Sequence, residues 1–428
     1  MTDAERAWIH NRGTAYETTE GLRESIRGLV DDVRTRGDAA LIDALQTFDG
    51  VAVDADGLRV SDDEFAHALA TIDPAVHDGI RQMIHNIRRF NEALHRRRAS
   101  WTSEIAPGHV VGERVGPVAS AALFCPSGKA SYPSVLAQIA TPAVVAGVPQ
   151  LTVIVPPVPG GSGEVDAAVL VVAQELGIRE VFRVNGPAGV AAAAFGTETI
   201  PAHGMVVGPG SPPVSLAQLE VRAHGVDSVV LGPTESMVVA DGSADPAWLA
   251  ADLLNEAEHG TDSTVVLVTA DQSVIDGANH HVAEQLARLP EERREAATSA
   301  LGVNGGAILV DDLDEAFHVA NWFAAEHCQI ATSDPWAHSQ KLEHAGEILL
   351  GQHTPFAAGN FTLGGPAALP TGGFANRAGG ITVEQFLKAA AIGHLDARAF
   401  AAVADSTIAL ADHEGFPAHA NSIHIRRA

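Results

Sequence analysis

The sequence predicts an α/β fold made of two Rossmann-like, incomplete parallel-sheet domains, with a helical N-terminal arm and a C-terminal helical tail. Two observations predict it. From about Val110, short apolar or β-branched runs alternate with helical stretches, the pattern of a parallel sheet covered by helices. After Val226 a second alternation of the same kind begins, although the two segments share no sequence repeat.

The composition is that of an ordinary globular protein. The chain has 428 residues, 46% of them hydrophobic, so it can bury more than one core. A formal net charge of −26 argues against nucleic-acid and anionic-membrane partners, which need a basic surface. The uncharged stretch 130–163 is broken by prolines, so we expect no membrane span.

The cysteines and the first residues indicate a compartment. Cys125 and Cys328 cannot form a disulfide framework, and the opening MTDAERAWIHNRG lacks a signal-peptide pattern. We therefore expect a cytoplasmic protein in which both thiols are small buried residues.

Amphipathic helices are predicted before the first sheet. An apolar stripe predicts one helix over 18–37, and a second follows over 39–48. Pro74 starts a long helix that runs to about Arg98, where a run of arginines suits the helix dipole. We interpret these helices as a scaffold.

The first sheet is predicted from five runs. They are VVGERV (110–115), AALFC (121–125), LTVIV (151–155), EVFRV (180–184) and MVV (205–207), with helices over 133–146, 165–176 and 188–195. Small ligands bind such sheets beyond the carboxyl ends of the strands. The turns CPSGKASYPS, NGPAG and GPGS lie there, but none is a GxGxxG fingerprint. Each is either a plain loop or part of an unusual nucleotide site.

The second sheet is predicted from SVVLG, SMVVAD, STVVLVTAD, AILV and EILLG. Asp245 and Pro246 predict the start of a helix that runs through His259. Glu256 and His259 lie three residues apart on one face of that helix, a spacing that suits either two metal ligands or an ordinary surface pair.

Helices and one long loop complete the chain. Helices are predicted over 275–289, 291–301, 335–343, 383–392 and 397–413. The loop 359–380 is rich in Gly and Pro, and loops of this length in a compact domain are usually functional.

The dipeptide Glu326–His327 is the main candidate for chemistry, and it ends a helix predicted over 312–325. A carboxylate can deprotonate water and an imidazole can accept a proton near neutral pH, so the pair could run two proton transfers in one site. A solvated helix end is the alternative explanation.

Several blocks, taken together and in order, resemble the histidinol dehydrogenase family over nearly the whole chain. They are VRTRGDAALIDALQTFDG, GKASYPS, AFGTETIPAHGMVVGPG, GPTESMVVAD, AADLLNEAEHGTDS, FAAEH, GEILLGQHTP, LPTGGF and EG-x-x-AH. The resemblance implies a zinc-containing, NAD-dependent homodimer that oxidises an amino alcohol to the acid in two hydride transfers. It implies that His327 takes the hydroxyl proton and that Glu326 activates water.

The resemblance also implies a division of the chain. Residues 1–28 would form the N-terminal arm, and residues 110–225 the nucleotide-side domain. Residues 29–109 would join 226–380 in the domain that carries the acid–base pair and the metal ligands. Residues 381–428 would form a tail exchanged with the partner subunit.

For the metal, the resemblance implies Glu256, His259, Asn360 and, from the partner subunit, His419. The family has Gln and Asp where this chain has Glu256 and Asn360. Carboxylate and amide have exchanged places, so the ligand charge is unchanged. We therefore expect a retained zinc site, with manganese or cobalt as alternatives.

For the substrate, the resemblance implies Ser134, Thr234, Ala367, Glu414 and His419. Thr234 stands where the family has Ser, and Ala367 where it has His. Loss of an imidazole from a pocket can change specificity strongly. We therefore expect a polar primary alcohol or amino alcohol other than histidinol. Genuine histidinol oxidation remains as one alternative. A non-catalytic binding paralogue, or one repurposed for different chemistry on the same fold, is the other.

For NAD, the resemblance implies Phe124, Pro126, Ala188, Pro209 and Ser211. An amide and a phenol that help to hold NAD in the family are replaced in the NGPAG and GPGS turns. Backbone groups would then carry more of the dinucleotide binding.

Overall fold

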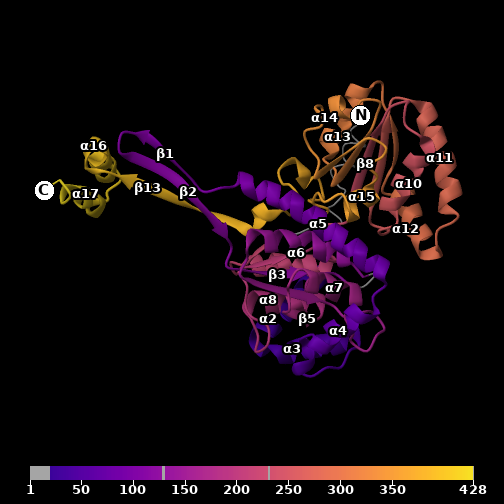
Figure 1. The fold of residues 1–428 in the computed structure, drawn as a ribbon, viewed down its shortest axis with the longest axis horizontal. Coiled ribbons are helices and arrows are strands. Elements are labelled where there is room, and N and C mark those ends of the chain that lie inside the picture. The colour runs from indigo at the N-terminus through magenta and orange to yellow at the C-terminus, as the bar shows by residue number, and fades with distance from the viewer. Residues whose placement is uncertain (1–19, 128–130, 230–231, 428) are drawn as a thin grey trace.

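The computed structural model describes residues 20–127, 131–229 and 232–427, which form two lobes and a projecting arm (Figure 1). Each lobe contains a five-stranded sheet, and the arm contains a three-stranded sheet. The α/β class with two parallel sheets is as predicted. Residues 1–19 of the predicted N-terminal arm lie outside the described residues, and residues 20–28 belong to the first helix.

The first lobe is a parallel sheet between two helical layers. Its elements are β3 (Ser120–Phe124), β4 (Gln150–Val155), β5 (Val181–Arg183), β6 (Met205–Val207), β7 (Asp227–Val229), α2 (Glu20–Arg36), α3 (Asp38–Ala44), α4 (Asp62–Thr71), α5 (Pro74–Arg97), α6 (Pro133–Ala146), α7 (Ala167–Glu175), α8 (Gly186–Phe195) and α9 (Pro212–Arg222), with a π-helical turn at Leu45–Asp49 and a 3-10 turn at Asp56–Leu58. The strands run in the order β5-β4-β3-β6-β7. Ser228 and Val229, which begin the run SVVLG predicted for the second sheet, lie in β7, so the first lobe extends beyond the predicted boundary at residue 225. Side chains of β3 alternate, so Leu123 packs against α4 to α7 and Phe124 against α2, α3, α8 and α9.

The N-terminal helices pack on this first lobe, which corrects the predicted grouping of 29–109 with 226–380. Helix α2 contacts α8 and α9, while α5 contacts α6. The apolar stripes of α2 and α5, which include Val30 and Ile87, are buried in the two core clusters of the first sheet. Helix α5 also reaches the second lobe, because Asn86 Nδ2 donates to the Thr362 carbonyl at 2.7 Å.

The second lobe repeats the same layered plan. Its elements are β8 (Glu235–Ala240), β9 (Thr264–Thr269), β10 (Gly306–Leu309), β11 (His327–Ala331), β12 (Glu347–Leu350), α10 (Pro246–Ala257), α11 (Gln272–Leu286), α12 (Glu291–Gly302), α13 (Leu313–Phe323), α14 (Pro335–Ser339) and α15 (Phe356–Phe361), with a 3-10 turn at Phe374–Asn376. The strands run in the order β10-β9-β8-β11-β12, and all neighbouring pairs are parallel. In both lobes the first strand along the chain lies at the centre, the next two extend the sheet to one side and the last two extend it to the other. Helices α10 to α12 cover one face and α13 the other.

The arm corrects two predictions. It consists of β1 (Trp101–Ala106), β2 (His109–Pro117), β13 (Leu387–Leu395), α16 (Ala397–His413) and α17 (Pro417–His424). A 3-10 turn (Val383–Phe386) precedes β13 and is buried in the core of the first lobe. The run VVGERV lies in β2, in an antiparallel sheet rather than the first parallel one. The predicted helix over 383–392 is mostly strand β13. Its Ala-rich sequence favours a helix, but pairing with β2 along the whole strand outweighs that propensity.

Local start signals were reliable where they were strong. Helices α5 and α6 begin at Pro74 and Pro133 as predicted. Asp245 caps α10, because its side chain accepts from the Ala247 amide at 2.8 Å. Among the described residues, no helix is both long and apolar enough to cross a bilayer.

Candidate active site

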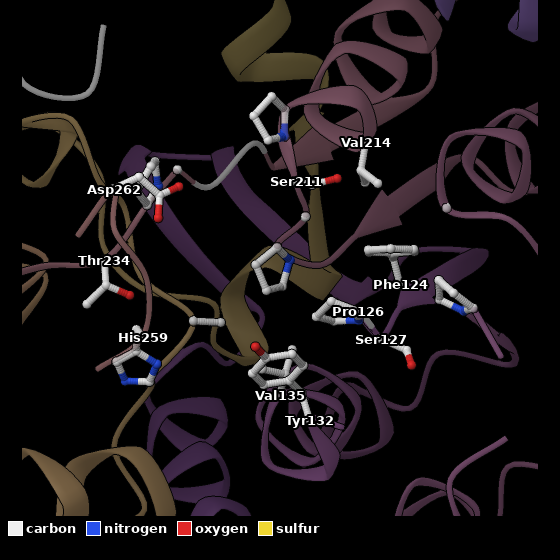
Figure 2. Close-up of a pocket in the computed structure, with 18 of the residues that line it drawn as sticks. Phe124, Pro126, Ser127, Tyr132, Val135, Ser211, Val214, Thr234, His259 and Asp262 are labelled. Atoms are coloured by element: carbon white, nitrogen blue, oxygen red, sulfur yellow. The ribbon is translucent and has the colours of Figure 1, made fainter. Parts of the chain in front are cut away.

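A pocket of about 1220 Å³ lies between the two lobes (Figure 2). One wall comes from segments that follow strands of the first sheet and includes Phe124 and Pro126. The other wall comes from the second lobe. Figure 2 shows Thr234 and His259 of that wall facing Phe124 and Pro126 across the open space.

The first wall is formed at the carboxyl ends of the strands. Pro126, Pro156, Asn185 and Pro209 follow β3, β4, β5 and β6 and all line the pocket. Gly208 permits a close approach here, since its φ is 146° and a Cβ would lie 2.0 Å from the Phe124 carbonyl oxygen. Helices α8 and α9 begin at this wall without a capping side chain. Their N-termini carry partial positive charge, which suits an anionic ligand.

Four of the five residues expected to contact NAD line the pocket: Phe124, Pro126, Pro209 and Ser211. The fifth does not. Ala188 is fully buried in the core of the first lobe, because the inner face of α8 packs on the sheet. Asn185, Gly186 and Pro187 of the same turn line the pocket instead.

Glu326 and His327, the candidate acid–base pair, lie at the amino end of the second sheet. Helix α13 ends at Phe323, before the predicted Ala325, because Ala324 adopts a left-handed φ of 50° and its amide bonds the Ala320 carbonyl. Ala324 is the only non-glycine with positive φ among the described residues. The chain then extends, and His327 becomes the first residue of β11, between β8 and β12. Glu326 and His327 are therefore fixed by sheet pairing.

His327 has a defined orientation. Its Nδ1 lies 2.8 Å from Glu347 Oε2, so the carboxylate accepts from Nδ1–H and leaves Nε2 toward Glu326, whose Oε1 is 3.8 Å away. Burial by itself would lower the pKa of His327. The hydrogen bond to Glu347 and the charges of Glu326 and Glu256 outweigh burial and raise the pKa to about 9. The imidazole therefore holds a proton readily.

Glu326 is buried beside several charges. Its Oε2 accepts from the Glu235 amide at 3.1 Å, and the residue is 8% exposed. Burial raises its pKa to about 8, although the His327 charge and the Glu235 amide favour the carboxylate. A carboxyl group with a pKa near neutrality can give and take a proton at working pH.

Three of the predicted metal ligands converge. Glu256, in the last turn of α10, is fully buried, and its Oε1 accepts from Asn360 Nδ2 at 3.0 Å. His259 Nε2 lies 3.8 Å from the same oxygen. Burial would raise the pKa of Glu256, but His259, His327 and Ser236 together lower it to about 2. One carboxylate, one imidazole and one amide thus lie together around Glu256 Oε1. This set fits zinc once the Asn360 amide turns to present its oxygen in place of Nδ2.

The expected substrate contacts divide into two groups. Ser134, Thr234 and Ala367 line the pocket. Glu414 and His419 lie on the arm with α16 and α17, away from both lobes, and do not line the pocket of their own chain (Figure 1).

Several site residues were not anticipated from the sequence. Glu347 opens β12 directly beside His327 in the sheet register, and Ser236 Oγ donates to Glu256 Oε2 at 2.7 Å. Gln138 is buried in the pocket wall. The block GEILLG contained the signal for Glu347, a carboxylate just before a buried strand, but only the strand pairing gives it a partner.

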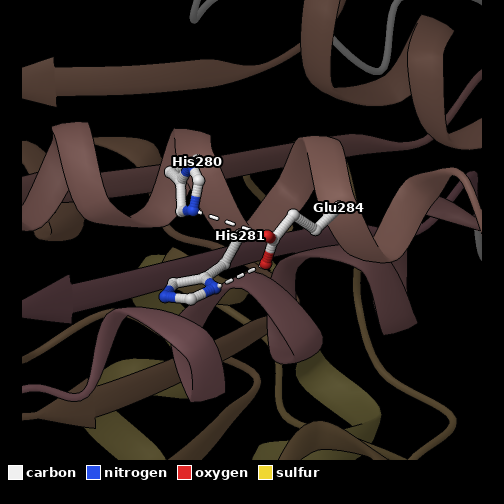
Figure 3. Close-up of side chains that lie close together, drawn as sticks. All are labelled: His280, His281 and Glu284. Carbon is white, nitrogen blue, oxygen red and sulfur yellow. Dashed lines mark hydrogen bonds and ion pairs between the residues drawn. The ribbon is translucent and has the colours of Figure 1, made fainter.

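Two further features lie outside the pocket. His280, His281 and Glu284 of α11 bring possible ligand atoms within 4.8 Å of one another on the surface (Figure 3). Cys125 and Cys328 are free and buried, as predicted. Burial raises the pKa of both thiols, that of Cys328 to about 12, so neither is a reactive thiolate.

Comparison with known proteins agrees with the resemblance. A sequence model described as histidinol dehydrogenase matches residues 13–427. The chain is 42% identical over 406 residues to a histidinol dehydrogenase of Synechococcus, covering 94% of this chain and 92% of the relative. It is 39% identical over 401 residues to a "histidinol dehydrogenase homolog 2" of Mesorhizobium japonicum, covering 94% and 90%. A crystal structure of histidinol dehydrogenase from Elizabethkingia anophelis aligns with a TM-score of 0.93, at 28% identity, over 100% of this chain and 96% of that one. The chain therefore belongs to the histidinol dehydrogenase family.

Proposed function

We propose that this protein is a zinc-dependent, NAD-linked dehydrogenase that oxidises a polar primary alcohol or amino alcohol through the aldehyde to the carboxylate. One observation carries the proposal. A buried carboxyl–imidazole pair, Glu326 and His327, lies in the same pocket as the converging groups of Glu256, His259 and Asn360. We place it in the cytoplasm, because its two buried thiols are free.

Each protein group has a task that its contacts support. Glu347 holds His327 through Nδ1, so Nε2 is the atom that takes the hydroxyl proton. Glu326, held by the Glu235 amide, takes a proton from the water that adds to the aldehyde carbon. When bound, zinc supplies positive charge that orients the substrate, and NAD supplies the hydride acceptor. The positive charge that zinc would bring to Glu256 and His259 would also lower the pKa values of Glu326 and His327, so it favours the ionised Glu326 and the neutral His327.

The dinucleotide would occupy the first wall. The turns after β3, β5 and β6 line the pocket, and the N-termini of α8 and α9 suit a pyrophosphate. Phe124, Pro126, Pro209 and Ser211 are the side chains we expect at this ligand.

A homodimer would complete the site. In one chain Glu414 and His419 lie on the arm, away from both lobes. We propose that the arm crosses to a second subunit, where His419 becomes the fourth metal ligand and Glu414 contacts the substrate.

Two substrates follow from different observations. L-histidinol is favoured by relatives such as the Synechococcus protein, which carry the name histidinol dehydrogenase. A different polar alcohol is favoured by the pocket residues Thr234 and Ala367, and by the relatives named only as homologs of the family.

One experiment separates these candidates. Zinc-loaded protein is supplied with NAD and with L-histidinol or a panel of primary alcohols, and NADH is followed at 340 nm. Rapid NADH formation from L-histidinol supports the first candidate, and formation from another alcohol alone supports the second. Absence of NADH with every alcohol, together with absence of NAD binding by calorimetry, would contradict the proposed function.

A further inference from the structure

We propose that the first turn of α6, Gln138 and Arg293 together bind an anionic group of the substrate, such as a carboxylate or a phosphate ester. This inference rests on the proposed function and deepens it, because it names the class of alcohol. The first turn and Gln138 belong to α6 and Arg293 belongs to α12, and residues of all three parts line the active-site pocket.

Helix α6 opens directly into the pocket. Tyr132, Ser134 and Val135 of its first turn line the wall, and Figure 2 shows Tyr132 and Val135 there. Tyr132 occupies the N-cap position, and its side chain makes no capping hydrogen bond. Tyr132 therefore leaves the amides of Ser134 and Val135 uncapped, whereas the Leu136 amide bonds Cys125 and Pro133 has no amide hydrogen. The positive end of a 14-residue helix faces the space that a substrate would fill.

Gln138 adds an unsatisfied donor on the same helix face. It follows Ser134 by four residues, so both point to the same side. The residue is only 2% exposed, and its Oε1 accepts from the Ala367 amide at 3.3 Å. Its Nε2 is buried and has no hydrogen-bond partner among the described residues. A buried donor without a partner is costly, and an oxygen acceptor on a ligand would remove that cost.

Arg293 supplies the charge. It lies in the first turn of α12, where the helix dipole disfavours a cation. Its Nη1 donates to the Glu258 carbonyl at 3.1 Å, and it makes no ion pair with any described residue. The neighbouring Arg294 pairs with Glu291 on the surface. Arg293 also acts on Tyr132, since burial raises the pKa of that phenol and the Arg293 charge opposes the rise.

Carboxylates outnumber cations around the pocket as a whole, but the charge that acts on the first turn of α6, at Tyr132, is that of Arg293. Glu256, Glu258, Asp262 and Glu326 line the second-lobe side. Among the described lining residues, Arg293 is the only Lys or Arg. An anionic group at α6 would be attracted by Arg293 and the uncapped helix amides, and a small movement of the Gln138 side chain would let its buried Nε2 donate to the same group. A cationic group there would meet only donors and a like charge.

The test uses the full-length, zinc-loaded protein with NADH bound, so that any dinucleotide phosphate site is already filled. D-glycerate, glycerol 3-phosphate and neutral glycerol are titrated by calorimetry into the wild type and the variants Arg293→Gln, Arg293→Lys, Gln138→Leu and Arg294→Gln. We expect Arg293→Gln to weaken binding of one or both anions by about 10- to 100-fold, and Gln138→Leu by about tenfold. Arg293→Lys should retain part of the affinity, and Arg294→Gln should leave it within about twofold.

The possible outcomes separate the two proposals. If the variants weaken the binding of D-glycerate or glycerol 3-phosphate but not of glycerol, the subsite is supported. The anion whose affinity falls more shows whether the subsite prefers a carboxylate or a phosphate. Equal losses for glycerol and the anions, or no effect of Arg293→Gln, would overturn it. If the anions bind as expected but no alcohol yields NADH, the subsite stands and the dehydrogenase proposal fails. If L-histidinol alone is oxidised and its KM is unchanged in Arg293→Gln, the dehydrogenase stands and the subsite fails.

Discussion

The two sheets have the same strand order but present opposite ends to the pocket. The first sheet contributes its carboxyl ends, where α6, α8 and α9 begin. The second contributes its amino ends, where α10 and α13 terminate near Glu256 and Glu326. Helix N-termini favour anions and helix C-termini favour cations. Because the two lobes share one strand order but face the pocket with opposite sheet ends, one wall is suited to phosphates. The other wall is suited to a metal ion and an imidazolium.

The largest expected effect is on the second wall. His327→Asn should reduce kcat by about 10³-fold, because it removes the proton acceptor that Glu347 orients. Zinc content and NADH affinity should be unchanged, as measured by plasma mass spectrometry and calorimetry. Glu326→Gln should stop the reaction at the aldehyde. Full activity of His327→Asn would remove the base assignment.

The exchanged ligands provide the next test. Glu256→Gln should weaken zinc binding by about 100-fold, because the site would keep no carboxylate from this chain. The double variant Glu256→Gln with Asn360→Asp should recover most of the affinity, since it restores one carboxylate. Competition with a chromogenic chelator measures both. If the single variant binds zinc as tightly as the wild type, these groups do not hold the metal.

A backbone change should damage the first wall alone. Gly208→Ala should lower the free energy of unfolding by about 3 kcal/mol and weaken NADH binding, because the new Cβ would lie 2.0 Å from the Phe124 carbonyl oxygen. Gly225→Ala is the control, since Gly225 has a φ of 86° but no heavy atom within 4 Å of its Cβ position. It should cost only about 1 kcal/mol. Equal effects of the two changes would contradict the close-approach argument.

Acid sensitivity should arise partly in the first lobe. His203 is 3% exposed, neither ring nitrogen has a partner, and burial lowers its pKa to about 4. In the unfolded chain His203 binds a proton with a pKa near 6.5, whereas in the folded chain it stays neutral until the pH approaches 4. The free energy of unfolding should therefore fall as the pH drops from 6.5 toward 4, by up to about 3 kcal/mol. His203→Leu should flatten the dependence of urea midpoints on pH over this range. His413→Gln, at an exposed position, should leave the pH dependence unchanged. If His203→Leu loses as much stability as the wild type between pH 6.5 and pH 4, the assignment to His203 is refuted.

The smallest effect concerns the turn before Glu326. Ala324→Gly should stabilise the protein by about 0.5 kcal/mol, because glycine accepts the φ of 50° without strain. Ala401→Gly, at an exposed position inside α16, should do the reverse and cost about 1 kcal/mol. Thermal unfolding measures both. Destabilisation by Ala324→Gly would mean that the left-handed turn is not strained.

The prediction of elements succeeded where a local signal was complete. Pro74, Pro133 and the Asp245–Pro246 pair each marked a helix start that the structure confirms. Predictions failed where a partner strand decided the conformation. The Ala-rich segment 387–395 is a strand only because β2 lies beside it, and β11 was missed because its short run HCQIA follows a helix without a turn signal.

The site shows the same division. Glu256, His259, Glu326, His327 and Asn360 were proposed from the sequence, and the structure places all five at one pocket. Ala188 faces the core instead, since a position in a motif does not say which face of a helix it occupies. The contacts of Glu347, Gln138 and Arg293 are made with segments 20 or more residues away, and no motif encodes them.

By itself, the sequence determined the α/β class, most of the helices and the family, because caps, apolar runs and ordered blocks are local properties of the chain. Only the tertiary structure decided that the first sheet meets the pocket with its carboxyl ends and the second with its amino ends. That choice depends on how two lobes pack, a long-range arrangement of surfaces that local periodicity does not encode. It also determines the sign of the helix dipoles on each wall, and therefore which charges each wall can bind.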